Sequence, residues 1–164
     1  MTFKIIAVVL SVLVISVLAL GCTGNDPAAL KDSAKPVEAT WINPLSTDQT
    51  VSIPVEAVNM HTNVHFKVNT DIGELVLMAY MFDDDIFIRS NVCPPCGSIG
   101  FALDDSILIC DACASTFDAS TGKGIGGACV AYPKESVPYT VSGGTIIMNL
   151  EDVMSAHQES LRRK

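Results

Sequence analysis

The sequence predicts a small, mainly β domain that carries two cysteine knuckles and ends in one α-helix. Short runs of β-branched and aromatic residues, separated by turn formers, begin at Val51 and continue to Leu150. Two Cys-x-x-Cys pairs interrupt these runs, and the last residues change to a helical pattern. The chain of 164 residues has room for one modest domain plus an N-terminal extension.

Residues 1–21 have the composition of an export segment. Met1–Lys4 supplies a positive start, Ile5–Leu20 is an almost unbroken apolar run, and small residues lead into Cys22. The order Ala19-Leu20-Gly21-Cys22 resembles a lipobox, in which the cysteine is lipidated after cleavage of a signal peptide. The alternative is an uncleaved N-terminal anchor helix. Both alternatives predict a prokaryotic protein held at the cell membrane, with its domain on the extracytoplasmic side.

Residues 22–50 predict a tether, because they are rich in Pro, Ala, Asp, Ser and Thr and show little periodicity. Trp41 is the exception, and we expect it to dock on the edge of the domain. Residues 51–164 then form the folded domain.

Strands and turns follow each other in the first half of this domain. Strands are expected in the runs VSIPVEAV (51–58), NVHFKVNT (63–70), GELVLMAYMF (73–82) and IFIRSNV (86–92).

Two hairpins and a helix complete the prediction. Residues 99–110 read as a hairpin turning at Asp104-Asp105, and residues 137–150 as a second hairpin turning at Gly143-Gly144. The end of the chain, Glu151–Arg163, is expected to be helical. Asn149 is placed to cap this helix, and cations in its last turns suit the helix dipole.

Cys93, Cys96, Cys110 and Cys113 form the most informative pattern in the chain. Two Cys-x-x-Cys turns are separated by thirteen residues, and the hairpin between them returns the second pair beside the first. Four thiolates in a tetrahedral arrangement suit Zn²⁺ or iron, including an iron–sulfur cluster. The spacing is close to that of zinc ribbons. The sequence therefore predicts one joint metal site and leaves the metal open.

Disulfides are the main alternative, because the expected compartment is oxidising. Either each pair closes on itself or the pairs are bonded to each other. A thioredoxin-like role for Cys93-Pro94-Pro95-Cys96 requires a helix N-terminus, whereas Gly97 and Gly100 indicate a loop.

Two further groups are candidate ligands. Cys129 follows a glycine-rich stretch and is either an additional ligand, a thiol beside the ligands, or a small buried residue. His61 and His65 are spaced to share one face and define a possible secondary metal site, with an ordinary, partly buried histidine as the alternative.

Charge and composition argue against other classes of function. The net charge is −8 and Lys plus Arg total 10, so the chain lacks the basic face that nucleic-acid binding requires. No Ser/His/Asp grouping or paired carboxylate frame is evident, and we expect a protein that is not an enzyme.

One stretch resembles a known cluster-binding loop. CDACASTFDASTGKG, which begins at Cys110, looks like the second cluster loop of Rieske proteins, and PKESVPYTVSGGTIIM resembles their closing strands. Cys113 stands where the Rieske loop has histidine, and Cys93-x-x-Cys96 stands where that family has Cys-x-His. The resemblance implies a Rieske-like or zinc-ribbon-like β domain with an all-thiolate centre, whose potential is expected to be lower than that of a His-ligated one.

A longer resemblance covers residues 51–150. Ile53-Pro54, His65-Phe66, the two cysteine pairs and Gly126-Gly127-Ala128-Cys129 up to Pro133 follow the pattern of the membrane iron–sulfur-containing FtrD-like family. The resemblance implies an iron–sulfur or other metal centre acting in electron transfer, with a redox or metal-transport membrane protein as partner and iron transport as a possible context. The alternatives are a structural Zn²⁺ site in an assembly module without redox activity and a copper or iron carrier.

Overall fold

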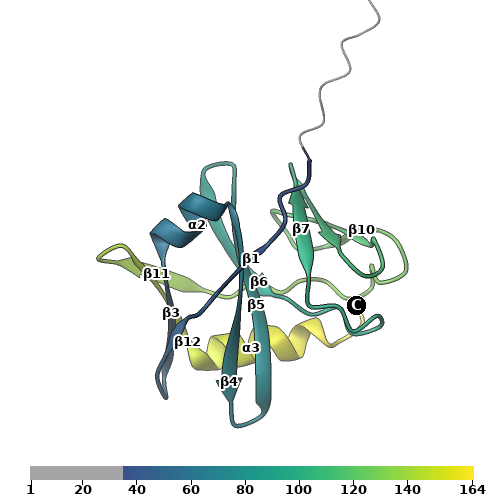
Figure 1. Ribbon diagram of the computed structural model, residues 1–164. Coiled ribbons are helices and arrows are strands. Elements are labelled where there is room, and N and C mark those ends of the chain that lie inside the picture. The colour runs from purple at the N-terminus through teal and green to yellow at the C-terminus, as the bar shows by residue number, and fades with distance from the viewer. Residues whose placement is uncertain (1–34) are drawn as a thin grey trace, which may run out of the picture. The chain divides into compact units, whose positions relative to one another are not determined.

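The computed structural model describes residues 35–164 (Figure 1). The predicted export segment 1–21, Cys22 and the first part of the predicted tether lie outside the described residues. Among the described residues, no helix has the length and apolar character needed to span a membrane.

A central four-stranded sheet forms the middle of the domain, with strand order β1-β4-β5-β6. Its strands are β1 (Thr40–Ile42), β4 (Asn63–Thr70), β5 (Gly73–Phe82) and β6 (Asp85–Ser90). The strands β4, β5 and β6 form an antiparallel meander, while β1 pairs in parallel with β4. The strands predicted at 63–70 and 73–82 are therefore confirmed, and the strand predicted at 86–92 is present but ends at Ser90.

A second sheet, ordered β11-β12-β3-β2, lies to the left in Figure 1. Its strands are β2 (Leu45–Ser46), β3 (Thr50–Pro54), β11 (Tyr139–Ser142) and β12 (Thr145–Asn149). The predicted hairpin turn at Gly143-Gly144 is confirmed, and both glycines have positive φ angles, of 56° and 76°.

A third sheet, ordered β10-β9-β8-β7, lies on the right in Figure 1, and its strand β8 ends at Cys110 while the other described cysteines lie in the segments next to its strands. Its strands are β7 (Phe101–Asp104), β8 (Ile107–Cys110), β9 (Thr116–Asp118) and β10 (Gly124–Gly126). The predicted hairpin between the two cysteine pairs is β7–β8, in which Phe101 pairs with Cys110.

The two helices of the described chain differ from the prediction, one in its presence and the other in its C-terminal end. The run 51–58, expected to be a strand throughout, ends at Pro54 and continues as α2 (Val55–His61), because proline lacks the N–H that the next ladder bond requires. The terminal helix α3 (Leu150–Ser160) begins as predicted, with the Asn149 side chain accepting a hydrogen bond from the Glu151 N–H at 2.9 Å. It ends before the expected Arg163, so the terminal cations lie beyond it.

The folded region begins before the predicted boundary at residue 51. Both β1 and β2 lie in the stretch expected to be a tether, and β1, which carries Trp41, pairs with β4 at the edge of the central sheet, so that Trp41 docks at an edge as predicted. Without β1, the backbone donors and acceptors on one side of β4 would be unpaired, and β1 can satisfy them whatever its side chains are.

The central sheet is buried on both faces, which creates two cores. On one face, Leu75, Leu77 and Ala79 pack with the second sheet and α3; on the other, Met78 and Tyr80 pack with the cysteine-bearing sheet. Two-sided burial explains why β5 is an almost continuous apolar run.

Arg89 fastens the loop that follows β9 to the central sheet. Its side chain is buried, and its Nε donates to Tyr80 Oη at 2.8 Å. Its Nη1 donates to the Lys134 carbonyl at 2.9 Å and its Nη2 to the Ser120 carbonyl. Tyr80 Oη in turn donates to the Ala119 carbonyl at 2.6 Å. The network joins β5 and β6 to the segment 119–134.

We predict that Gly122→Ala weakens the fold more than Gly143→Ala does. Both glycines have positive φ, which costs a side-chain-bearing residue about 1–2 kcal/mol. A Cβ on Gly143 meets nothing, whereas one on Gly122 collides with the Lys134 carbonyl and the Arg89 guanidinium. Urea unfolding should show a loss of roughly 3 kcal/mol or more for Gly122→Ala. Equal losses in the two variants would contradict this account of Gly122.

Candidate metal centre

The two cysteine knuckles share one backbone geometry. In the first, the Cys93 N–H donates to the Ser98 carbonyl at 2.9 Å, and the Gly97 N–H donates to the Cys93 carbonyl at 2.8 Å. In the second, the corresponding bonds run from Cys110 to Ser115 at 3.0 Å and from Ala114 to Cys110 at 2.9 Å.

The residue after each second cysteine has a positive φ, +71° at Gly97 and +53° at Ala114. Each turn therefore directs its two sulfurs to the same side.

The β7–β8 hairpin brings the two knuckles together. The sulfurs of Cys93, Cys96, Cys110 and Cys113 all lie within 4.8 Å of one another, and Cys96 Sγ is 3.7 Å from Cys110 Sγ. A single tetrahedral ion with metal–sulfur bonds of about 2.3 Å separates its sulfurs by roughly 3.8 Å. The donor set thus fits a metal of the zinc or iron type.

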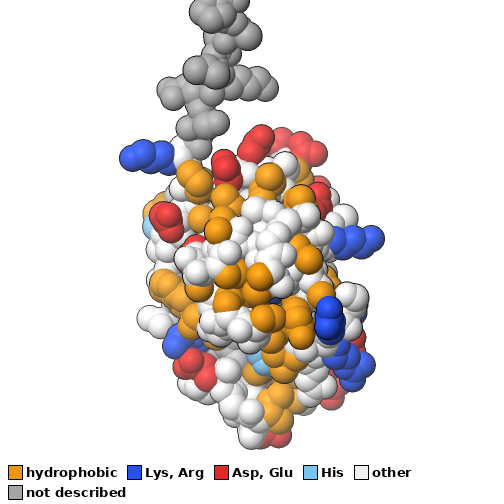
Figure 2. Space-filling model, turned by 90° about the vertical axis from the view of Figure 1, so that its right-hand side faces the viewer, with side chains coloured by type: hydrophobic (Ala, Val, Ile, Leu, Met, Phe, Trp, Pro, Cys, Tyr) orange, Lys and Arg blue, Asp and Glu red, His pale blue; other side chains and the backbone are white. Residues whose placement is uncertain are grey.

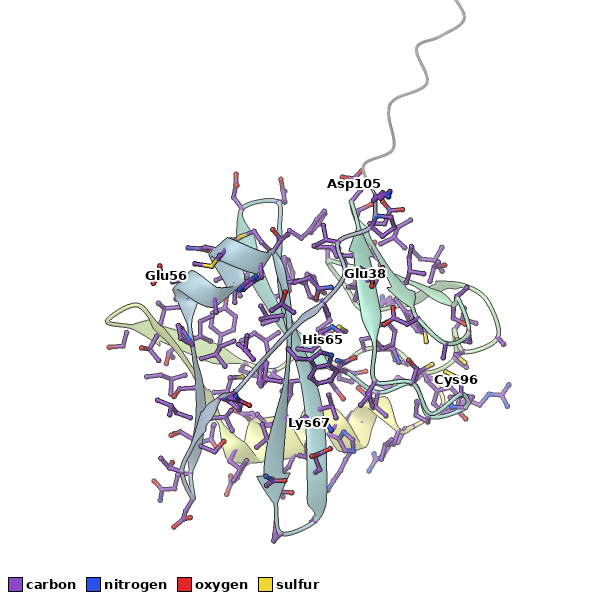
Figure 3. All side chains as sticks on the ribbon, in the orientation of Figure 1. Glu38, Glu56, His65, Lys67, Cys96 and Asp105 are labelled. Atoms are coloured by element: carbon purple, nitrogen blue, oxygen red, sulfur yellow. The ribbon has the colours of Figure 1, made fainter. Side chains whose placement is uncertain are left out.

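The site is closed on the inside and open at one edge. Cys93 and Cys110 are buried, Cys113 is partly exposed, and Cys96 is exposed at the right-hand edge of the domain in Figure 3. A cluster of several irons binds its thiolates on different irons and needs a wider sulfur set. Of the four cysteines, Cys96 is the most exposed.

The five described cysteines are all free thiols. The sulfurs of Cys96 and Cys110 are 3.7 Å apart and those of Cys113 and Cys129 are 3.6 Å apart, far longer than the ~2.05 Å of a disulfide bond. The structure therefore shows the thiol arrangement and not the disulfide alternative.

Burial and hydrogen bonding shift the pKa values of the thiols in opposite directions. Desolvation raises the pKa of Cys93 and of Cys110. The hydrogen bond with Ser115 lowers the pKa of Cys113 to about 6, with a Sγ–Oγ distance of 3.2 Å. Cys113 therefore ionises more readily than Cys93 or Cys110, and its thiolate form accepts a hydrogen bond from the Ser115 hydroxyl.

Cys129 lies beside the four sulfurs and outside their group. It is buried, its Sγ is 3.6 Å from Cys113 Sγ, and its N–H donates to Ser115 Oγ at 3.0 Å. This geometry favours the predicted thiol beside the ligands over an isolated core residue, since Cys129 touches a ligand directly.

Lys134 is a site residue that the sequence did not reveal. Its side chain is fully buried, and its Nζ donates to the carbonyl of Val92, the neighbour of Cys93. Burial lowers the pKa of Lys134, and the nearby thiols oppose that shift. No pattern around Pro133-Lys134 distinguishes this lysine from a surface one, so only the packing identifies it.

The structure does not support a metal site at His61 and His65. His65 lies on β4 inside the domain (Figure 3), fully buried, while His61 ends α2 and is partly exposed. Among the described residues, the four cysteines form a group of potential metal ligands, and neither histidine belongs to a group of three or more. The spacing of four residues does not bring the two imidazoles to one site, because His61 ends the helix α2 whereas His65 lies on the strand β4.

His65 is instead a buried neutral side chain. Its ring lies 5.3 Å from that of Trp41 in an edge-on arrangement, and neither ring nitrogen has a hydrogen-bond partner within the described residues. Burial lowers the pKa of His65 to about 4.

We predict that His65 makes the domain sensitive to acid. The unfolded chain binds a proton near pH 6.5 and the folded chain only near pH 4, so stability is full above this window and falls as the pH decreases through it. The unfolding free energy should drop by roughly 3 kcal/mol across the window. Urea unfolding of His65→Phe at several pH values should show a flatter pH dependence of the unfolding free energy than the wild type. An unchanged slope in His65→Phe would refute the assignment.

Solved ferredoxins show partial structural likeness to this chain. The Sphingomonas yanoikuyae B1 ferredoxin is 23% identical, with a TM-score of 0.41 over 45% of this chain and 74% of that chain. The ferredoxin of carbazole 1,9a-dioxygenase from Nocardioides aromaticivorans IC177 is 17% identical, with a TM-score of 0.47 over 65% of this chain and 97% of that chain. Comparison with curated proteins gave no match.

The family comparison covers both knuckles, Cys129 and most of the central sheet. Residues 58–159, more than half of the chain, match the family described as membrane iron–sulfur containing protein FtrD-like. This match agrees with the resemblance carried by the five-cysteine pattern. The chain belongs to the FtrD-like family of membrane iron–sulfur containing proteins.

Proposed function

We propose that this protein transfers electrons through an iron–sulfur centre held by Cys93, Cys96, Cys110 and Cys113. The observation that carries the proposal is the convergence of four sulfurs at a site that is buried inside and exposed at Cys96. When bound, an iron–sulfur centre supplies one-electron chemistry. The family, whose description names an iron–sulfur protein, supports iron over other metals.

The site has a buried inner half at Cys93 and Cys110 and an exposed outer half at Cys96. The buried Cys93 and Cys110 hold the inner half away from water, against Phe101 and Phe117 of the same core. The outer half, at Cys96, lies at the surface, where a partner can approach closely. Four protein thiolates leave no open position for a substrate on a tetrahedral ion, which favours a carrier over an enzyme.

The surface around the outer half favours a protein partner. Ile125 is 58% exposed and Val130 37% exposed, and both belong to the segment that runs from β10 to Cys129 and beyond. Figure 2 shows apolar side chains across the middle of this side of the molecule. We propose a redox or metal-transport membrane protein as the partner, with iron transport as the context that the family resemblance suggests.

A structural zinc site is the second candidate, and one observation favours it. The four sulfurs already lie within the span that a single tetrahedral ion requires. Under this alternative the domain is an assembly module and the sulfurs carry no electrons.

The visible spectrum of anaerobically purified protein, with metal analysis, distinguishes the two candidates. We expect sulfur-to-iron charge-transfer bands that bleach on reduction, and iron without stoichiometric zinc. Cys110→Ser should lose the bands and the metal, because it removes a buried ligand. Cys129→Ser, which replaces the thiol outside the four-atom group, should keep both. A colourless wild-type protein with one bound zinc would overturn the proposed function.

We propose that the protein is attached to the outer side of the cell membrane through a lipid on Cys22. The support is the predicted signal peptide in residues 1–21 and the family's description as a membrane protein. In prokaryotic cells, Cys22→Ser should move the protein from the membrane fraction to the soluble extracytoplasmic fraction. If Cys22→Ser stays in the membrane at the wild-type level, the uncleaved anchor is correct instead.

A further inference from the structure

We infer that Lys134 is the buried counter-charge of the metal centre: its ammonium group supplies the positive charge that an all-thiolate centre needs inside the protein. The inference rests on the proposed four-cysteine site, and it holds for iron–sulfur and zinc occupants alike. It assigns to Lys134 a positioning and tuning role and no role as a ligand.

The groups around the buried Lys134 ammonium stabilise its charge only in part. Its Nζ lies 4.5 Å from the centre of the Phe117 ring and 5.2 Å from that of Phe101, and it donates to the Val92 carbonyl. Aromatic faces and a carbonyl stabilise an ammonium group in part. Neither neutralises it.

The buried charge of Lys134 has no carboxylate as an ion-pair partner among the described residues. Lys134 and Arg89 are the buried charged residues of the described chain, and both are cationic. Within residues 35–164, no carboxylate forms an ion pair with either one. An unpaired buried charge is costly, so a missing anion is expected close by.

The thiols supply that anion once they bind metal. The Lys134 ammonium donates to the carbonyl of Val92, the residue before Cys93, and lies over the Phe117 ring, which packs in the same cluster as Cys93, Cys110 and Cys129. Four thiolates carry more negative charge than a divalent ion or a two-iron core neutralises, so the loaded centre is an anion. The buried Lys134 ammonium and the loaded centre are therefore complementary in charge.

The backbone of Lys134 is held so that this charge stays in place. The Arg89 guanidinium donates to the Lys134 carbonyl at 2.9 Å, and the Lys134 N–H donates to the Gly122 carbonyl at 2.8 Å. The side chain then extends from the clamped backbone towards Val92, beside the first knuckle.

Two consequences follow from complementary charge. A nearby positive charge favours the more negative, reduced state of a redox centre, so Lys134 raises the reduction potential. It also strengthens retention of the centre, while in the metal-free protein the same charge is uncompensated and destabilising.

The test compares Lys134→Met, which keeps length and apolar volume, with Lys134→Arg, which keeps the charge. Lys123→Met is the matched control, because Lys123 is an exposed lysine of the same segment. Three measurements are made on the full chain: the rate of metal release to a chelator, the midpoint potential, and the urea midpoint of the metal-free form.

We expect Lys134→Met to release the metal at least tenfold faster and to have a lower midpoint potential. Its metal-free form should unfold at an equal or higher urea concentration than the wild type. Lys134→Arg should release metal more slowly than Lys134→Met, and Lys123→Met should match the wild type.

Unchanged metal release and potential in Lys134→Met would overturn the inference, and so would a metal-free Lys134→Met protein that is unfolded. If the wild type holds zinc and no redox centre, the proposed electron transfer fails. The counter-charge role of Lys134 is then tested by the rate of metal release to a chelator alone. A failure of the proposed electron transfer and a failure of the counter-charge role therefore remain distinguishable.

Discussion

The convergence of four cysteine sulfurs within 4.8 Å of one another is the constraint on which the rest of this domain depends. It requires two backbone turns of the same shape, and Gly97 and Ala114 adopt positive φ to make them. It also requires the short β7–β8 hairpin, whose register sets Phe101 against Cys110. A small sheet that serves two knuckles has little core of its own, so it packs against the larger domain for stability.

The central sheet provides that support because it is covered on both faces. Tyr80 and Arg89, on the face towards the cysteines, fix the segment 119–134 through backbone carbonyls. The same segment delivers Cys129 beside Cys113 and the Lys134 ammonium beside the first knuckle. Stability and the electrostatics of the site therefore depend on the same contacts.

Much of this arrangement could be predicted from local patterns. The strands at 63–70 and 73–82 and the Gly143-Gly144 turn were predictable, because turn chemistry and β-branched runs act locally. The α2 helix was not, since its apolar residues continue the composition of the preceding strand and only Pro54 marks the change. The early strand β1 was also missed. Its pairing depends on the open edge of β4, which lies far along the chain.

The sequence by itself determined the mainly β class, the terminal helix and the paired spacing of the four cysteines, because spacing and periodicity are local properties of the chain, and its resemblance to the FtrD-like family indicated the family. Tertiary structure alone decided that His61 and His65 do not join in one ligand group, that Cys129 lies next to Cys113, and that Lys134 is buried. The physical reason is burial. Whether a thiol, an imidazole or an ammonium group meets water or the protein interior depends on segments distant in sequence, and that environment sets its charge and its chemistry.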